Sequence, residues 1–451
     1  MFVFAMTNIH STRRQCPIVA LLFALTSVTL VVTPPSVVAQ VGPGDIIRTF
    51  RGETMGTTYM VKIFGAPDVD DDIRIDMDAE LRRVNDQMST YLASSEISRF
   101  NTSTETDWFD VSADTAKVVD FAQQVSQKTN GAFDVTVGPL VNAWGFGTDG
   151  RTQEPPEASK LAEIKASIGY KNLSVRLDPP ALRKTIPTLQ IDLSAIAKGH
   201  GVDRLVALLA KAGATNVFVE VGGEIRTSGD KSGQPWTAGI QLPDTVKTVP
   251  MIAHKMGGGT GSDESMATSG DYRNFFTSEG QRYSHTIDPR TTSPVKHDLA
   301  SVSVVAKSCM VADAWATAIS VLGPDQGIEL AREEDLSVLL ITRNESGYQM
   351  MGAGTLLQYA GSPAEAVIGA AVAQPTEGGG LLPTVLLTAM AMGLILFAMA
   401  IGVIFGRKAI SGSCGGLANH KNEDGSVACS LCSNPADACK ELREQMQKET
   451  T

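Results

Sequence analysis

An uncharged apolar segment at residues 381–406 is the feature that most constrains how this chain folds. A helix that rises about 1.5 Å per residue crosses a bilayer core of ~30 Å, so a segment of this length predicts a membrane-spanning helix. Arg407 and Lys408 follow it directly, and basic residues mark the cytoplasmic flank of such helices. We therefore expect the large preceding part of the chain to lie outside the cytoplasmic membrane, and the tail, residues 407–451, to lie inside.

The N-terminus has the order of features that is typical of an export signal. Arg13 and Arg14 precede an apolar stretch at 17–32, and the small residues at 37–39 resemble a cleavage site. Residues 1–39 are therefore predicted to be a signal peptide. The alternative is an uncleaved N-terminal anchor, for which the apolar core is short. Both interpretations place the following residues outside the cytoplasmic membrane.

The cysteines are concentrated near the C-terminus. The chain has six, and the large middle part holds only Cys309, so that part is not a disulfide-stapled scaffold. A Cys-x₂-Cys pair with two further cysteines close by, in the cytoplasm, favours a soft-metal or iron–sulfur site over disulfides. A redox-sensing or purely structural thiol cluster is the alternative. The four tail cysteines are Cys414, Cys429, Cys432 and Cys439.

The middle of the chain, residues 45–360, is predicted to be a mixed α/β or α+β domain. Hairpins and βαβ-like pieces coexist there, without the regular alternation of a doubly wound sheet. A linker rich in Pro, Gly and Ala at 361–380 precedes the membrane segment. The formal charge of −11 argues against a nucleic-acid-binding surface, which needs a basic patch. The clearest expected elements are strands at 46–64, 217–221 and 301–305, helices at 73–90 and 113–129, and a strand–turn–helix joint at 188–209.

The strand–turn–helix joint places an acid and a lysine beside a helix N-terminus. A β-branched, apolar run at 188–191 leads into Asp192, and Lys198 stands just before a helical pattern of apolar residues that begins at Val202. Helix N-termini carry unpaired N–H groups and partial positive charge, so together with the lysine they favour a phosphate-binding site. The alternative is an ordinary joint with a solvated Lys198.

Asp313 and Thr317 form a candidate metal site. They lie four residues apart on a predicted helix, so their side chains leave the same face. A carboxylate and a hydroxyl are hard oxygen donors that suit Mg²⁺, and backbone carbonyls from a nearby loop would complete the set. The alternative is that Asp313 caps the helix and Thr317 is a surface residue.

His285 is the candidate general base, because an unperturbed imidazole titrates near neutral pH. The alternative is a structural histidine beside a turn at 288–290, whose aspartate and arginine would pair with each other. Three further residues, Met55, Tyr91 and Phe133, lie near glycine-rich bends. They would stack on a flat heterocycle or, alternatively, pack in the core.

Taken in order, these motifs resemble the ApbE family, the FAD:protein FMN transferases, over about residues 49–360. A set of segments that covers the whole domain is more specific than any single motif. His200 stands where the family usually has tyrosine, and Thr286 replaces a usual apolar residue, so the resemblance leaves acceptor recognition open. The matching segments are Met55-Gly56-Thr57, Ser89-Thr90-Tyr91, Gly131 to Leu140, Asp192 to Gly199, Gly222-Gly223-Glu224, His285 to Arg290 and Asp313 to Ala318.

The resemblance implies an α/β domain of two subdomains that holds FAD between them. It implies an Mg²⁺-dependent transfer of FMN from FAD onto a threonine or serine hydroxyl of an acceptor protein, with release of AMP. Lys198 and Asp313 would act on the transferring phosphate, and His285 would assist the acceptor hydroxyl. The implied FAD contacts are Met55, Tyr91, Ala132, Phe133, Asp134, Asp192, Lys198 and Ile287, and the implied Mg²⁺ ligands are the carbonyls of Ala195 and Ala316 with the side chains of Asp313 and Thr317.

The end of the chain, from about residue 381 to 440, resembles the small membrane maturation factor of the sodium-translocating NADH:quinone reductase. The match covers the apolar segment, the run at 413–417 and the later cysteines. It implies iron at the tail cysteines, and as partners the acceptor subunits of that reductase or a similar ion-translocating complex. The expected location is the cytoplasmic membrane, with the catalytic domain on the periplasmic side. Alternatives for the main domain are an Mg²⁺-dependent FAD pyrophosphatase that releases FMN and AMP, and a non-catalytic flavin-binding protein.

Overall fold

The computed structural model describes residues 46–361, apart from 67, 148–149, 151, 153, 244–249, 273 and 345–346, together with residue 390. The chain divides into two compact units, residues 1–373 and 374–451, and nearly all described residues belong to the first. The predicted signal peptide, the linker beyond residue 361, the membrane segment at 381–406 and the four tail cysteines lie outside the described residues. Among the residues that are described, no helix is both long enough and apolar enough to cross a membrane.

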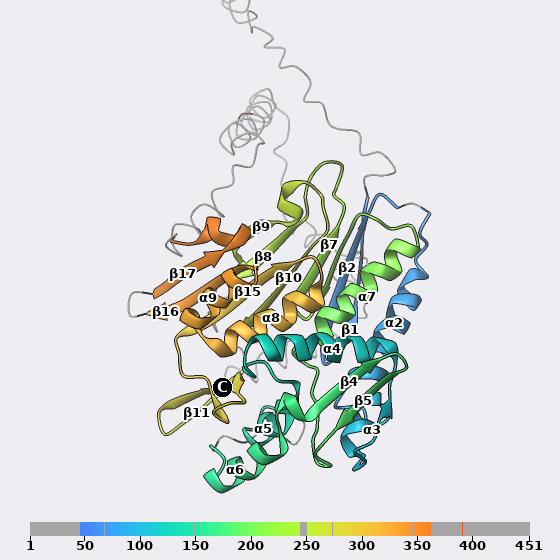
Figure 1. The fold of residues 1–451 in the computed structure, drawn as a ribbon. Coiled ribbons are helices and arrows are strands. Elements are labelled where there is room, and N and C mark those ends of the chain that lie inside the picture. The colour runs from blue at the N-terminus through green and yellow to red at the C-terminus, as the bar shows by residue number, and fades with distance from the viewer. Residues whose placement is uncertain are drawn as a thin grey trace, which may run out of the picture. The chain divides into compact units, whose positions relative to one another are not determined.

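An eight-stranded sheet forms the centre of the domain (Figure 1). Every neighbouring pair of its strands is antiparallel, so the βαβ-like pieces expected from the sequence are not formed in it. In spatial order the strands are β1 (Ile47–Thr54), β2 (Thr57–Phe64), β6 (Val217–Val221), β7 (Glu224–Ser228), β10 (Glu264–Gly270), β15 (Leu299–Ala306), β16 (Ser337–Asn344) and β17 (Gly347–Ala353).

Helices cover one face of this sheet. α2 (Ile73–Met88) and α7 (Ala197–Lys211) share an apolar cluster with β2 and β6, and the buried positions of α7 follow the predicted helical spacing from Val202. α8 (Cys309–Leu322) packs on β10 and β15, and α9 (Pro324–Glu333) packs on β16. Figure 1 shows α7, α8 and α9 side by side across the sheet. The hairpin of β8 (Thr237–Gln241) and β9 (Pro250–Lys255), with η3 (Met256–Gly259) and η4 (Gly354–Tyr359), contributes to a separate apolar cluster with the sheet.

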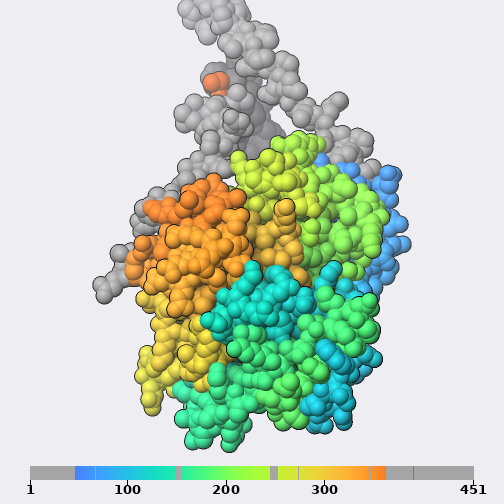
Figure 2. All heavy atoms as spheres, viewed as in Figure 1, coloured from blue at the N-terminus to red at the C-terminus, as the bar shows by residue number. Residues whose placement is uncertain are grey.

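A smaller part of the domain is inserted in the sequence between β2 and β6, although these two strands are neighbours that pair Ile63 with Val217. In Figure 2 the teal atoms of α4 lie between the orange atoms of the C-terminal part of the domain and the green atoms of the smaller part. The elements of this part are α3 (Glu96–Thr102), β3 (Phe109–Asp110), α4 (Ala113–Lys128), η1 (Val135–Val137), α5 (Gly138–Ala143), α6 (Ala158–Ser167), η2 (Tyr170–Asn172), β4 (Leu173–Leu177) and β5 (Pro180–Lys184), with β3, β5 and β4 forming a three-stranded sheet.

Two short strand pairs pack beside α5. They are the hairpin β11 (Phe275–Ser278) and β12 (Gln281–Ser284), and the pair β13 (Ile287–Asp288) and β14 (Ser293–Pro294). The ring centroids of Trp144 and Tyr283 are 5.4 Å apart, and Tyr283 stacks on Phe276 with a centroid distance of 5.1 Å. These aromatic contacts join the hairpin to the smaller part of the domain.

The strand expected at 188–191 is not formed. The Asn101 side chain takes the place of a partner strand, since its Nδ2 donates to the Ile191 carbonyl (2.9 Å) and its Oδ1 accepts the Ile191 N–H (2.8 Å). The Asp192 N–H then donates to the Val135 carbonyl at 2.7 Å. The backbone of Ile191 and the N–H of Asp192 are thus satisfied in a loop, without a partner strand.

One carboxylate of α7 caps the N-terminus of α8. Asp203 accepts the backbone N–H groups of Cys309 and Met310, both at 2.9 Å, and the Ser308 hydroxyl at 2.7 Å. It also pairs with Arg226 of β7 at 2.6 Å. Because the first N–H groups of a helix have no partner within it, this carboxylate fixes the position of α8 relative to α7.

We expect Asp203→Ala to lower the free energy of unfolding by about 2–4 kcal/mol, because it leaves helix N–H donors and an arginine without their acceptor. Asp86→Ala, which removes an exposed carboxylate from α2, is the matched control and should change stability by less than about 0.5 kcal/mol. Urea denaturation followed by circular dichroism measures both values. Equal unfolding midpoints for the two variants would contradict the capping role.

Candidate active site

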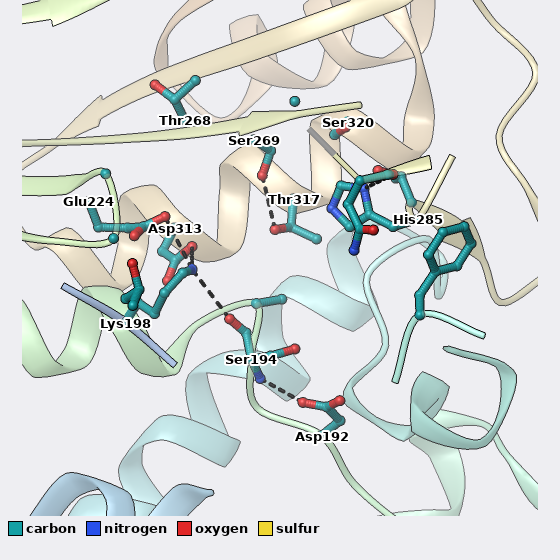
Figure 3. A pocket seen from close by; sticks show the side chains of 18 of the residues that line it. Asp192, Ser194, Lys198, Glu224, Thr268, Ser269, His285, Asp313, Thr317 and Ser320 are labelled. Carbon is teal, nitrogen blue, oxygen red and sulfur yellow. Dashed lines mark hydrogen bonds and ion pairs between the residues drawn. The ribbon is translucent and has the colours of Figure 1, made fainter. Parts of the chain in front are cut away.

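A cleft of about 810 Å³ gathers residues from the sheet, from α7 and α8, and from the smaller part of the domain. This volume lies in the range of small-molecule and cofactor sites, roughly 300–1,000 Å³. Figure 3 shows Lys198, Glu224 and Asp313 converging at one end of the view, with His285 at the other. Thr317, which contacts Ser269, lies between them.

Lys198 stands at the centre of an ionic cluster. It is the second residue of α7, so it lies inside the first helical turn and not just before the helix as the sequence predicted. Its Nζ lies 3.1 Å from Glu224 Oε1, 3.7 Å from Asp313 Oδ1 and 3.5 Å from the Ser194 carbonyl. The solvated Lys198 of the alternative interpretation is therefore not observed, although 29% of its side chain stays exposed to the cleft.

The charges in this cluster depend on its burial. Burial raises the pKa of Glu224 to about 7, against the lowering effect of Lys198. Burial also opposes the charge on Lys198, but Asp313 and Glu224 outweigh it and raise the pKa of the lysine. Lys198 is therefore positively charged at neutral pH and available to an anionic group in the cleft.

Asp313 satisfies a free backbone donor at the N-terminus of α7. Its Oδ2 accepts the Gly199 N–H at 2.9 Å, a group in the first turn that has no partner within the helix. Asp313 is 2% exposed and lies inside α8, which Ser308 precedes as N-cap, so it is not the helix cap of the alternative interpretation.

The oxygen donors of the cleft fit a magnesium ion. Asp313, Thr317 and Ala195 all line it, and a carboxylate, a hydroxyl and a carbonyl are the hard donors that Mg²⁺ prefers. In the described part of the chain, His, Cys, Asp and Glu side chains form no group of three or more that would hold a metal ion. A magnesium site here would therefore depend on neutral oxygens as well as on Asp313.

His285 is held at the base of the β11–β12 hairpin. Its backbone N–H and its ring Nδ1 both bond to the Asn274 carbonyl, at 3.1 Å. A carbonyl only accepts hydrogen bonds, so Nδ1 carries the proton and Nε2 is the basic nitrogen. Burial lowers the pKa of His285, which keeps the imidazole neutral at neutral pH. The rings of Phe146 and His285 form a T-shaped pair, with centroids 6.3 Å apart.

The hairpin that carries His285 is anchored to the main sheet. Asp271, which is 8% exposed, accepts from Arg282 of β12 at 3.0 Å and from Arg343 of β16 at 2.7 and 2.8 Å. The pairing of Asp288 with Arg290 that the sequence suggested is also present, at 2.8 Å.

The structure places the residues expected to contact FAD in two groups. Tyr91, Asp192, Lys198 and Ile287 line the cleft, and Tyr91 is 80% exposed. The other four do not line it: Met55 packs near Gly201 of α7, Ala132 and Phe133 are buried, and Asp134 accepts the Thr136 and Tyr170 N–H groups. Ala316, whose carbonyl was an expected metal ligand, is buried in α8 and does not line the cleft either.

Sequence reasoning gave no role to Glu224 or Asn274. Glu224 stood in a recognised Gly-Gly-Glu segment, but its proximity to Lys198 depends on where α7 meets the β6–β7 turn. The contact of Asn274 with His285 could have been predicted from the hairpin, because its register pairs Phe275 with Ser284 and so brings Asn274 opposite His285.

Comparison with known proteins identifies the fold. The ApbE family matches residues 55–340. An FAD:protein FMN transferase of Vibrio cholerae is 42% identical over 302 residues, 66% of this chain and 88% of that protein. One from Haemophilus influenzae is 40% identical over 313 residues, 67% of this chain and 88% of that protein. The solved structure of the flavin transferase ApbE from Vibrio cholerae has a TM-score of 0.63 and 39% identity, and the match covers 70% of this chain and 99% of that chain.

The mixed α/β fold is thus that of the flavin transferase ApbE structures. The chain belongs to the ApbE family. A second family, described as (Na+)-NQR maturation NqrM, matches residues 403–451, which lie outside the described residues. One chain therefore joins an ApbE domain to an NqrM segment.

Proposed function

We propose that this chain is an FAD:protein FMN transferase, which moves FMN from FAD onto a threonine or serine hydroxyl of an acceptor protein and releases AMP. The observation that carries the proposal is one cleft lined by Lys198, Asp313 and His285 in a chain of the ApbE family. The similar proteins from Vibrio cholerae and Haemophilus influenzae are named for this activity.

The side chains of the cleft have distinct tasks in this reaction. The acceptor hydroxyl attacks the phosphorus of the FMN phosphate, a new O–P bond forms, the bridging P–O bond breaks, and AMP leaves with the bridging oxygen. Lys198 places positive charge where the transferring phosphate gathers negative charge. His285 accepts the hydroxyl proton at Nε2, because Nδ1 is committed to Asn274. Tyr91, Asp192 and Ile287 line the same cleft and would contact FAD.

The proposal includes a requirement for Mg²⁺. Asp313, Thr317 and the Ala195 carbonyl would hold the ion, and when bound it would supply positive charge to the phosphate oxygens. Asp313 also orients the first turn of α7 through the Gly199 N–H, so the residue that holds the metal helps to place Lys198.

Incubation of the purified protein with FAD and Mg²⁺, with and without a candidate acceptor domain, tests the proposal. Flavin fluorescence that stays on the acceptor after denaturation, with one AMP released per flavin attached, is the expected result. Equal AMP release without an acceptor would instead indicate an FAD pyrophosphatase. Tight FAD binding without AMP release would indicate a flavin-binding protein.

The pH dependence tests the role of His285. We expect the acidic limb of kcat/KM to lie below the 6.5 of an ordinary histidine, because burial lowers the pKa of His285 and protonation removes the base. His285→Gln should lower transfer about 100-fold or more and abolish that limb, while the Kd for FAD changes little. Stopped-flow AMP release between pH 5 and 9 measures the rate and the acidic limb, and a fluorescence titration measures the Kd for FAD. An unchanged acidic limb in the variant would exclude His285 as the base.

The tail extends the proposal to the whole chain. The NqrM match at 403–451 supports a maturation factor that attaches flavin and handles metal, with the cysteines 414, 429, 432 and 439 as iron ligands. We place the ApbE domain on the periplasmic side of the cytoplasmic membrane, after the signal at 1–39, and the tail inside, after the span at 381–406. The partners would be subunits of an ion-translocating NADH:quinone reductase. A deletion strain whose reductase keeps both covalent flavin and iron would contradict this extension.

A further inference from the structure

The Gly222-Gly223-Glu224 turn has no role in the mechanism described above. Gly222 and Gly223 have φ values of 62° and 106°, which only glycine adopts easily, and they close the β6–β7 hairpin at the edge of the cleft. Glu224 follows them and is 4% exposed. Its Oε1 lies closer to Lys198 Nζ (3.1 Å) than Asp313 Oδ1 does (3.7 Å).

The turn approaches the Lys198 side chain at two points, its stem and its ammonium group. A Cβ at Gly222 would lie 3.3 Å from Lys198 Cδ and 2.8 Å from Thr57 Cγ2, so the lysine stem runs close to the bare backbone of the turn. The ammonium at the end of that stem then meets Glu224. The hairpin thus restricts both the stem and the charged end of one flexible side chain.

This arrangement is not explained by stability. Two buried carboxylates share one ammonium, and Glu224 Oε2 has no hydrogen-bond partner within the described residues. A buried carboxylate oxygen without a donor costs free energy, so an uncharged side chain of the same shape would serve the fold as well or better. Asp313 also accepts the Gly199 N–H and is the expected metal ligand, which leaves Glu224 as the partner dedicated to Lys198.

We propose that Glu224 is a positioning residue, which holds the Lys198 ammonium against the transferring phosphate. This inference rests on the proposed flavin transfer. Negative charge on the phosphate is greatest in the transition state, so a displaced ammonium lowers kcat more than it weakens FAD binding. Because Glu224 acts through Lys198, its removal has no effect once the ammonium is gone.

A double-mutant cycle with Glu224→Gln and Lys198→Met tests this role, with AMP release from FAD as the readout. Glu224→Gln alone should lower kcat about 10-fold with KM for FAD within about twofold, because the ammonium is misplaced but present. In the Lys198→Met background the same change should alter kcat by less than about twofold. The thermal midpoint of Glu224→Gln should equal or exceed that of the wild type.

Glu264→Gln is the matched control. Glu264 is a largely buried carboxylate that does not line the cleft, and its Oε2 is bonded to His254 Nε2 at 3.0 Å and to the Gly257 N–H at 2.8 Å. This variant should lower the thermal midpoint and leave kcat unchanged, the reverse of Glu224→Gln.

Three results would overturn the positioning role while the wild type remains active. The first is additive losses of kcat in the cycle. The second is a more than tenfold higher Mg²⁺ requirement in Glu224→Gln, which would identify Glu224 as a metal ligand. The third is a lower thermal midpoint of Glu224→Gln with an unchanged kcat. A wild-type protein that neither releases AMP nor labels an acceptor would instead overturn the proposed function together with this role.

Discussion

Asp313→Asn is expected to lower Mg²⁺-dependent AMP release from FAD about 1,000-fold, an increase of about 4 kcal/mol in the barrier. The carboxylate lies 3.7 Å from Lys198 Nζ and accepts the Gly199 N–H at the first turn of α7. Asparagine keeps the shape and one oxygen acceptor but removes the negative charge that a divalent cation needs. Single-turnover AMP release over a Mg²⁺ titration measures the loss.

Folding of this variant has to be measured separately, because Asp313 is buried among the helices that form the site. A thermal midpoint within a few degrees of the wild type would assign the loss to the site itself. Thr317→Val, which removes the neighbouring hydroxyl, should weaken the response to Mg²⁺ in the same direction but by less. Turnover of Asp313→Asn at the wild-type rate would exclude Asp313 as a metal ligand.

Gly199→Ala is expected to destabilise the domain by about 3 kcal/mol and to lower AMP release about 100-fold or more. A Cβ at this position would lie 2.4 Å from the Cys309 carbonyl oxygen and 2.8 Å from Asp313 Cβ. Neither atom is the end of a flexible side chain, so α7 and α8 would have to separate. That movement would displace Lys198 from Asp313. Denaturant unfolding and AMP release measure the two effects.

Gly201→Ala is the matched control, two residues further along the same helix. Its Cβ would lie 2.8 Å from Met55 Cε, the mobile end of a long side chain, which can shift at little cost. The gain in helix propensity, about 1 kcal/mol, offsets this contact, so we expect a change in stability below about 1 kcal/mol. Equal losses in the two variants would show that the close approach of α7 to α8 does not explain Gly199.

Much of the fold could be predicted from local patterns. The strand pair at 46–64, the amphipathic helix from Ile73 and the strand at 217–221 have periodic apolar residues that match what each element buries. The end of the helix predicted at 113–129 is equally local: Asn130 and Gly131, which follow it, both have positive φ, and the Gly131 N–H donates to the Ser126 carbonyl at 2.8 Å. Such features depend on neighbours in the sequence, so a single sequence contains them.

The errors came from contacts between distant parts of the chain. The run at 188–191 has the composition of a strand, but a side chain ninety positions earlier, Asn101, satisfies its backbone. Strand direction likewise depends on partners that are distant in the sequence. The sequence therefore predicted βαβ-like pieces where the structure has antiparallel neighbours. In the site, the family motifs located Lys198, Asp313 and His285, whereas the positions of Asn274 and Glu224 became clear only from how the hairpins meet them.

The insertion of residues 65–216 between two paired strands has a consequence for biosynthesis. β2 leaves the ribosome long before its neighbour β6, and at the usual speed of translation the interval is on the order of ten seconds. During that time β1 can pair with one edge of β2, but the edge that later pairs with β6 is open and α7 is not yet there to cover the apolar side chains of β2. A nascent chain of this protein therefore exposes an unpaired, apolar strand edge that is prone to aggregation. Ribosome-bound holdases would protect newly made molecules from one another during that interval.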